Sequence, residues 1–306
     1  MANVHNGTLT IRLFGEIELS KGANVLPRFP TRKSTALFSA LVLNSGRIFH
    51  RDTLAEMFWG DLSIEKAKGC LRTDLWRIRN MLGLKEVSSE HYLLINKNSI
   101  GFNNEASYEL DVEQFEKKVT NLLKRPPQEL TNEESKILQE SINLYRGDLL
   151  ETCQDDWCVL QRESLRIKYL SALELLMRYY QCHGALDYAI EYGQKLLSHD
   201  PLLEHIHLEL MHCYCMKGNR LAAIRQYILC RNLLREELGV SPMGEVEQAY
   251  RAILTMSQHL NDKPVVNGNV ATQKIYSSVL HNIDTALTNI KSAENLLADI
   301  NRLLNK

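Results

Sequence analysis

The sequence has 306 residues, of which 44% are hydrophobic and 24% are charged, and its formal net charge is −1. This length suits two domains, and the composition is that of a soluble globular protein rather than of a disordered chain. The sequence contains no apolar run as long as a membrane span, and its N-terminus lacks the basic-then-apolar pattern of a secretory signal. Seven scattered cysteines, an odd number, argue against a disulfide framework. We therefore expect a cytoplasmic protein that does not associate with membranes.

The charge is distributed unevenly along the chain. Residues 28–85 carry eleven Lys and Arg against five Asp and Glu, whereas residues 111–306 carry 22 basic and 26 acidic residues. A local excess of positive charge is more informative about a polyanionic partner than a total near zero. The first part of the chain is therefore the candidate for nucleic-acid binding.

The first predicted elements are short strands followed by a helix. Apolar and polar residues alternate over 9–19 around Gly15, which predicts one or two strands, and an extended piece at 25–26 follows the turn at Lys21-Gly22. Thr31 or Ser34 then caps a helix that ends near Asn44.

A short extended segment at 48–49 precedes a second helix, which Asp52 is expected to cap and Gly60 to end. A third helix covers 64–82. Two apolar segments, 92–95 and 100–102, flank the turn signal at 96–99 and predict a hairpin. This order of elements is that of a winged helix-turn-helix, an α+β fold, with an additional N-terminal sheet.

The third helix is strongly amphipathic. Leu71, Leu75, Ile78 and Leu82 share one face. The rest of the helix carries five Lys and Arg residues against the two carboxylates of Glu65 and Asp74. Such a helix has the side chains needed to read the DNA major groove, because Arg pairs with guanine edges and with phosphate oxygens. The alternative is an ordinary surface helix with a solvated basic face.

The predicted DNA contacts fall into three groups. The outward positions of the third helix are candidates for base-edge contacts: Arg72, Thr73, Trp76 and Arg77. Phosphate contacts, which fix the register without reading sequence, are assigned to Lys66, Lys68, Arg79 and Asn80. Further phosphate contacts are expected from Arg32 and Lys33, in the first turn of a helix. Lys97, at the hairpin tip, is expected to reach the minor groove or the DNA backbone.

These segments resemble a known family. LTIRLFG, PTRKSTALFSALVLNSGRIFHRDTLAEMFW and AKGCLRTDLWRIRNMLG are similar to the DNA-binding domain of SARP-type bacterial regulators, itself akin to the response-regulator winged helix. The resemblance covers 8–110 and implies double-stranded DNA as partner, the same four base-reading positions and a place at the bacterial nucleoid. Gly69 and Cys70 stand where the family more often has other residues, so the sequence preference does not carry over.

A helical repeat region is predicted over 111–262. Residues 111–116 open it, a helix break and linker-like insertion follow at 124–127, and a long helical pattern covers 159–182. Four residues then recur 34 positions later, which is the tetratricopeptide period: Leu176, Tyr180, Gly184 and Ala189 return as Leu210, Tyr214, Gly218 and Ala223. We expect Trp157, Tyr180 and Tyr214 to be core residues.

This region resembles the bacterial transcriptional activation domain that adjoins the winged helix in SARP-type proteins. The resemblance covers about 111–256, and the REELGVSP run at 235–242 is its most specific part. It implies an activator that contacts RNA polymerase or pairs on adjacent half-sites. The fold class is thus mainly α, with a winged helix followed by tetratricopeptide-like repeats and a C-terminal heptad helix.

Residues 263–306 form a linker and a heptad pattern. Apolar residues alternate spacings of three and four through Tyr276, Val279, Ile283, Ala286, Ile290, Ala293, Leu297, Ile300 and Leu304. The pattern predicts a coiled coil and a homo-oligomer, with a dimer favoured. The alternative is a helix that folds back on the repeat region.

The sequence contains no recognisable catalytic motif, so we predict that the protein is not an enzyme and needs no cofactor. His205, Glu209 and His212 share a helix face, but we interpret them as surface or packing residues rather than as a metal site.

Two alternatives to a DNA-binding activator stay open. One is a regulator gated by a signalling nucleotide or metabolite, with phosphate-binding candidates Arg162, Arg166, Arg178, Arg220 and Arg225. The other is a scaffold that does not bind DNA.

Overall fold

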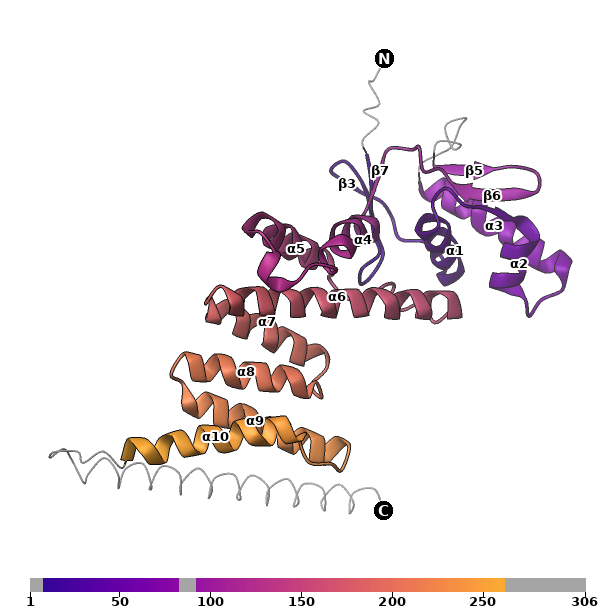
Figure 1. Cartoon of the computed structure of the whole chain (residues 1–306). Helices are drawn as coiled ribbons and strands as arrows, with labels where there is room; N and C mark the ends of the chain where they lie inside the picture. Colours follow the sequence, from indigo (N-terminus) through magenta and orange to yellow (C-terminus); the bar gives the residue numbers. More distant parts are fainter. Residues whose placement is uncertain (1–7, 83–91, 262–306) are drawn as a thin grey trace, which may run out of the picture. The chain divides into compact units, whose positions relative to one another are not determined.

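A computed structural model describes residues 8–82 and 92–261. The region up to residue 110 contains short strands and three helices (Figure 1): β1 Leu9–Arg12, β2 Glu18–Lys21, β3 Asn24–Val25, α1 Arg32–Leu43, β4 Ile48–His50, α2 Arg51–Trp59, α3 Ile64–Met81, β5 Leu93–Ile95, β6 Ser99–Phe102 and β7 Tyr108–Leu110. The region after it is helical: α4 Asp111–Leu122, a 3₁₀ turn η2 Pro127–Glu129, α5 Asn132–Leu144, α6 Asp156–Cys182, α7 Leu186–His199, α8 Glu204–Met216, α9 Arg220–Glu237 and α10 Gly244–Asn261.

The strands form two small sheets. The first has the order β3-β2-β1-β7, and the second has the order β4-β6-β5, in which β5 and β6 are the predicted hairpin. Helices α2 and α3 pack against each other, and α1 packs against α3. The mainly helical fold with an N-terminal winged helix is therefore confirmed.

The helix starts illustrate how local sequence fixes these elements. Thr31 caps α1, since its hydroxyl accepts a hydrogen bond of 3.1 Å from the Ser34 amide. The predicted cap of α2 is wrong by two residues. The helix begins at Arg51, and the imidazole of His50 accepts from the amide of Asp52, which places Asp52 in the first turn rather than before it.

Strand β7 was not predicted from the sequence. It pairs in parallel with β1, with Ile11 opposite Leu110. Directly after β7, the buried carboxylate of Asp111 accepts hydrogen bonds of 3.0 and 3.1 Å from the amides of Leu13 and Phe14. These contacts join the first strand of the chain to the start of α4.

The 34-residue repeat corresponds to two similar helix pairs, α6–α7 and α8–α9, whose helices follow one another in the stack (Figure 1). Gly184 and Gly218 end the first helix of each pair with φ of 70° and 73°, a conformation that favours glycine. Ala189 and Ala223 are fully buried in the second helices. The predicted tetratricopeptide-like arrangement is confirmed.

The linker-like insertion after residue 124 is short, because η2 and α5 follow it directly. Helix α5 begins with a capping box formed by Thr131 and Glu134.

The predicted heptad residues, Tyr276 to Leu304, lie outside the described residues. Among the helices of the described residues, none combines the length and the apolar character needed to cross a membrane.

Candidate nucleic-acid interface

Helix α3 has the two faces that the sequence predicted. Leu71, Leu75 and Ile78 are buried against the winged-helix core. Arg72, Thr73 and Trp76 are exposed on the opposite side, as are Lys66, Arg79 and Asn80. Trp76 is 64% exposed, which is unusual for so large an aromatic side chain. The helix therefore presents cations, a hydroxyl, one amide and one aromatic ring to solvent.

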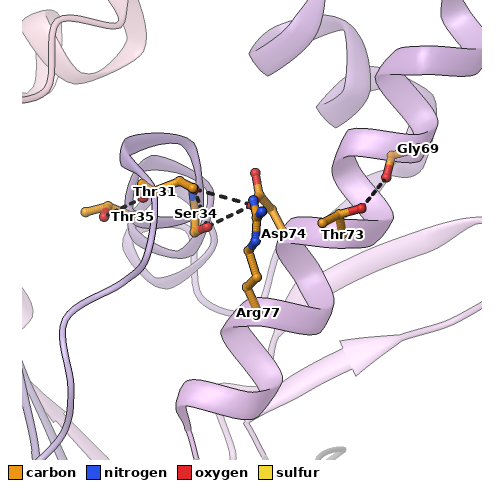
Figure 2. A network of polar contacts seen from close by, with 7 residues as sticks. All are labelled: Thr31, Ser34, Thr35, Gly69, Thr73, Asp74 and Arg77. Atoms are coloured by element: carbon orange, nitrogen blue, oxygen red, sulfur yellow. Dashed lines mark hydrogen bonds and ion pairs between the residues drawn. The ribbon is translucent and has the colours of Figure 1, made fainter.

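Asp74 departs from the expectation that it belongs to the solvent face. It is 3% exposed, and its carboxylate accepts a hydrogen bond of 2.8 Å from the Ser34 hydroxyl on α1. The same oxygen lies 2.7 Å from the guanidinium of Arg77, one turn further along α3 (Figure 2). The Thr31 hydroxyl donates a third hydrogen bond, of 3.4 Å, to the same Asp74 oxygen. Asp74 thus ties the start of α1 to the middle of α3 and fixes the direction of the Arg77 side chain.

Among the residues that the structure describes, Arg77, Lys68 and Lys33 of the predicted DNA-contacting cations form ion pairs with carboxylates. Arg77 pairs with Asp74, as above. Lys68 lies 2.8 Å from Asp52 on α2, and this hydrogen bond lowers the pKa of the Asp52 carboxyl. Lys33 lies 3.3 Å from Asp155, the residue that precedes α6. Bound DNA would have to compete with these carboxylates for the three cations.

The predicted residues are not all gathered in one place. An open groove of about 570 Å³ between α1, α2 and α3 is lined by four of them: Lys33, Lys66, Thr73 and Arg77. Arg32 is exposed in the first turn of α1, and Lys97 is exposed in the turn between β5 and β6. Arg51 was not predicted from the sequence as a residue of this site. Its side chain donates a hydrogen bond to the carbonyl of Asn96 and so stabilises the hairpin turn.

A second set of contacts, also missed, joins the winged helix to the helical region. The rings of Phe58 and Trp157 meet edge to face, with centroids 6.3 Å apart. The amide of Gly15 donates to the carbonyl of Asp148, and the amide of Leu150 donates to that of Leu13. These pairings involve residues more than 90 positions apart, which no local pattern in the sequence reveals.

Arg162, Arg166 and Arg178, three of the five arginines proposed as phosphate ligands in the helical region, are engaged in other contacts. Arg162 donates to the carbonyls of Leu149, Leu150 and Cys153. Arg178 pairs with Glu174, and Arg166 pairs with Glu163. His205 and His212 are exposed, and among the described residues no group of His, Cys, Asp and Glu is arranged to hold a metal ion.

Comparisons with known proteins give one family match and several relatives. Residues 110–254 match the family model of the bacterial transcriptional activator domain. The transcriptional regulatory protein MoaR1 of Mycobacterium tuberculosis is 23% identical over 250 residues, which is 81% of this chain and 80% of that protein. The regulatory protein AfsR of Streptomyces griseus is 24% identical over 254 residues, 82% of this chain but 25% of the relative.

A solved structure shares the fold. Mycobacterium tuberculosis EmbR, determined in complex with a low-affinity phosphopeptide, superposes with a TM-score of 0.66 at 17% identity and covers 92% of this chain and 71% of that chain. MoaR1 is a transcriptional regulatory protein, and AfsR is a regulatory protein. The activator-domain match over 110–254 and the similarity to MoaR1 and AfsR agree with the resemblance to SARP-type regulators seen in the sequence, and the likeness to EmbR shows the shared fold.

Proposed function

We propose that this protein binds double-stranded DNA through α3 and activates transcription. The observation that carries the proposal is the exposed face of α3, on which Arg72, Thr73 and Trp76 stand opposite a fully packed apolar face. A helix held in this way enters the major groove without any change in its packing. Its charge provides the phosphate attraction on which nonspecific DNA binding depends.

The ion pairs refine the roles of the individual residues. Arg72 is exposed on the outer face and carries the first base-edge contact. Arg77 reads a base from a direction that Asp74 fixes, since the two side chains are 2.7 Å apart. Lys68 and Lys33 contribute phosphate contacts only after their ion pairs with Asp52 and Asp155 have broken. Lys66, Arg79, Asn80, Arg32 and Lys97 complete the proposed phosphate contacts.

The helical region serves the activating step. The family match over 110–254 supports a role in protein contacts, and we assign RNA polymerase as the partner. The predicted domain limits, 8–110, 111–262 and 263–306, are part of this proposal, as is oligomerisation through the heptad residues. An oligomer raises the effective concentration of a second reading helix on tandem or symmetric sites.

Binding-site selection on the purified full-length chain tests the proposal. We expect a repeated sequence motif, with affinity that falls as salt increases. Arg72→Ala should weaken binding to the selected site by roughly 5- to 100-fold, as expected for the loss of a base contact. Arg235→Ala, an exposed arginine of α9, is the matched control and should leave binding unchanged. Selection of no motif, or equal losses in both variants, would contradict the assignment of α3.

A further inference from the structure

Nothing in the described part of the chain requires residue 69 of α3 to be glycine. Gly69 lies inside the first half of the helix, and its φ is not among the positive values that favour glycine. A methyl group added at its Cα would meet no atom of the described residues within 4 Å. Because glycine in a helix interior is less stable than alanine, its presence here indicates that something outside the chain approaches this turn closely.

Gly69 lies on the face of α3 that is proposed to enter the DNA groove. It lines the open groove of about 570 Å³ together with Thr73 and Arg77. Thr73 follows Gly69 by about one turn, and side chains on a helix lean toward its N-terminus, over the preceding turn. The space in front of the Thr73 side chain is therefore free of side-chain atoms from residue 69.

The hydroxyl of Thr73 is already hydrogen-bonded within the helix. It donates a hydrogen bond of 3.0 Å to the carbonyl of Gly69 (Figure 2). A hydroxyl has one proton, so in this arrangement it does not donate to a base. The methyl group on the same carbon is the other group that this exposed side chain offers to a ligand. An apolar group thus stands beside the space that Gly69 leaves open.

We propose that the methyl group of Thr73 reads the C5-methyl group of a thymine, and that Gly69 leaves the space which this methyl group fills. Thymine is the only one of the four bases with a methyl group on its major-groove edge, and the methyl group of threonine is suited to contact it. The N-terminal part of a recognition helix is the part that meets base edges. Because this assignment names the base that Thr73 selects, it rests on the function proposed above.

The neighbouring arginines give the site a second kind of contact. Arg72 is exposed beside Thr73, and Arg77 is held by Asp74 at 2.7 Å. A guanidinium pairs with the acceptors of guanine, whereas a methyl group distinguishes bases by their apolar surface alone. Each half-site that the protein selects should therefore contain a thymine as well as guanine.

Exchange of thymine for deoxyuridine in the selected site tests the methyl contact. Deoxyuridine keeps every polar group of thymine and lacks only the methyl group. We expect the full-length protein to bind about 4-fold more weakly when one thymine of the half-site is exchanged, which corresponds to the burial of one methyl-sized group. Fluorescence anisotropy with duplexes exchanged at one position at a time measures the loss. Equal affinity for all these duplexes would overturn the proposal.

Two substitutions of Thr73 separate its methyl group from its hydroxyl. Thr73→Val keeps a methyl group and lacks the hydroxyl, so it should retain the preference for thymine over deoxyuridine. Thr73→Ser keeps the hydroxyl and lacks the methyl group, so it should bind the two duplexes equally. A preference that survives in Thr73→Ser, or one that is lost in Thr73→Val, would overturn the proposal.

Gly69→Ala tests the space in front of Thr73. The added methyl group should weaken binding to the thymine duplex more than binding to the deoxyuridine duplex. Thermal denaturation should show a melting temperature no lower than that of the parent, since alanine favours the helix. Unchanged discrimination between the two duplexes would contradict the role of Gly69.

Failure of the proposed function gives a different result from failure of the thymine contact. If α3 does not read DNA, binding-site selection yields no motif, and both proposals are overturned. If α3 reads DNA without the methyl contact, a motif is selected whose thymines can all be exchanged for deoxyuridine without loss of affinity, and only the thymine contact is overturned.

Discussion

Asp74 of α3 and Ser34 of α1 are joined by a buried hydrogen bond of 2.8 Å, and the same carboxylate oxygen holds Arg77 (Figure 2). The carboxylate contributes to both the packing of the winged helix and the direction of a proposed DNA contact. Such a residue has a stability role and a positioning role, which can be measured separately.

Replacing Asp74 should destabilise the winged helix. Asp74→Ala removes the acceptor of Ser34 and the partner of Arg77 inside a nearly closed site, and we expect a loss of about 2–4 kcal/mol in the free energy of unfolding. Chemical denaturation of the full-length chain measures the change. Asp61→Ala, at an exposed position after α2, is the control and should change stability by less than about 0.5 kcal/mol. Equal stabilities of the two variants would show that the network contributes little.

Arg77 should affect sequence preference more than general affinity. Arg77→Ala is expected to cost about 1–3 kcal/mol in binding to the selected site while leaving nonspecific binding within a few-fold of the parent. Arg77→Lys should not restore the preference, because lysine lacks the planar two-pronged donor of arginine. Fluorescence anisotropy with specific and scrambled duplexes gives both affinities. Specific binding that survives either substitution would remove Arg77 from the base-reading group.

Arg162 should be needed for folding of the connection between the two regions. It satisfies the carbonyls of Leu149, Leu150 and Cys153, and Leu150 adopts a positive φ of 46°, which is strained for a leucine. We expect Arg162→Met to lose about 3–5 kcal/mol, since the carbonyls lose their donors. Glu163→Ala at the neighbouring exposed position is a suitable control for thermal denaturation. A melting temperature unchanged from the parent would argue against this role.

His207 predicts a pH dependence of stability. Its Nε2 lies 3.0 Å from the carbonyl of Pro201 and its Nδ1 lies 2.7 Å from the Gln226 amide nitrogen, an arrangement that suits the neutral ring. Burial lowers the pKa of His207 below its ordinary value of about 6.5. The unfolded chain therefore binds the proton more readily, and this stabilisation is complete above about pH 6.5 and declines as the pH falls through the folded pKa.

Thermal melts between pH 5 and pH 8 check this. The parent protein should lose more stability on acidification than His207→Gln, whereas His212→Gln, at an exposed position, should follow the parent. The opposite order would mean that the protonated imidazole is the stabilised form.

The heptad pattern predicts a concentration-dependent oligomer. Sedimentation of the full chain should give a dimer, and removal of residues 263–306 should give a monomer with weaker binding to paired half-sites. Substituting Ile283 and Ile290 together by Asp tests the same seam without shortening the chain. A dimer that persists in both variants would place the association elsewhere.

What the sequence predicted and what it missed have different physical origins. The α3 face and the Gly184 and Gly218 turns follow from patterns within a few residues, so periodicity and local backbone preference suffice to find them. Asp74 was placed on the wrong side because a charged residue at a helix edge reads as solvated unless its partner, Ser34, is known to lie opposite. Strand β7 and the Phe58–Trp157 contact depend on pairings between distant segments, which a single sequence does not specify.

The position of β1 has a consequence for how such proteins change over generations. Its backbone is paired with β7, its end donates to Asp111, and the following Gly15 and Phe14 meet the segment at 148–149. A recombination event that brought in a foreign winged helix ending at residue 110 would have to supply a first strand compatible with Asp111 and with the segment at 148–149. The winged helix and the helical region are therefore expected to be inherited together. Under the proposed function, new DNA preferences would arise by substitutions on α3 rather than by exchange of the whole winged helix.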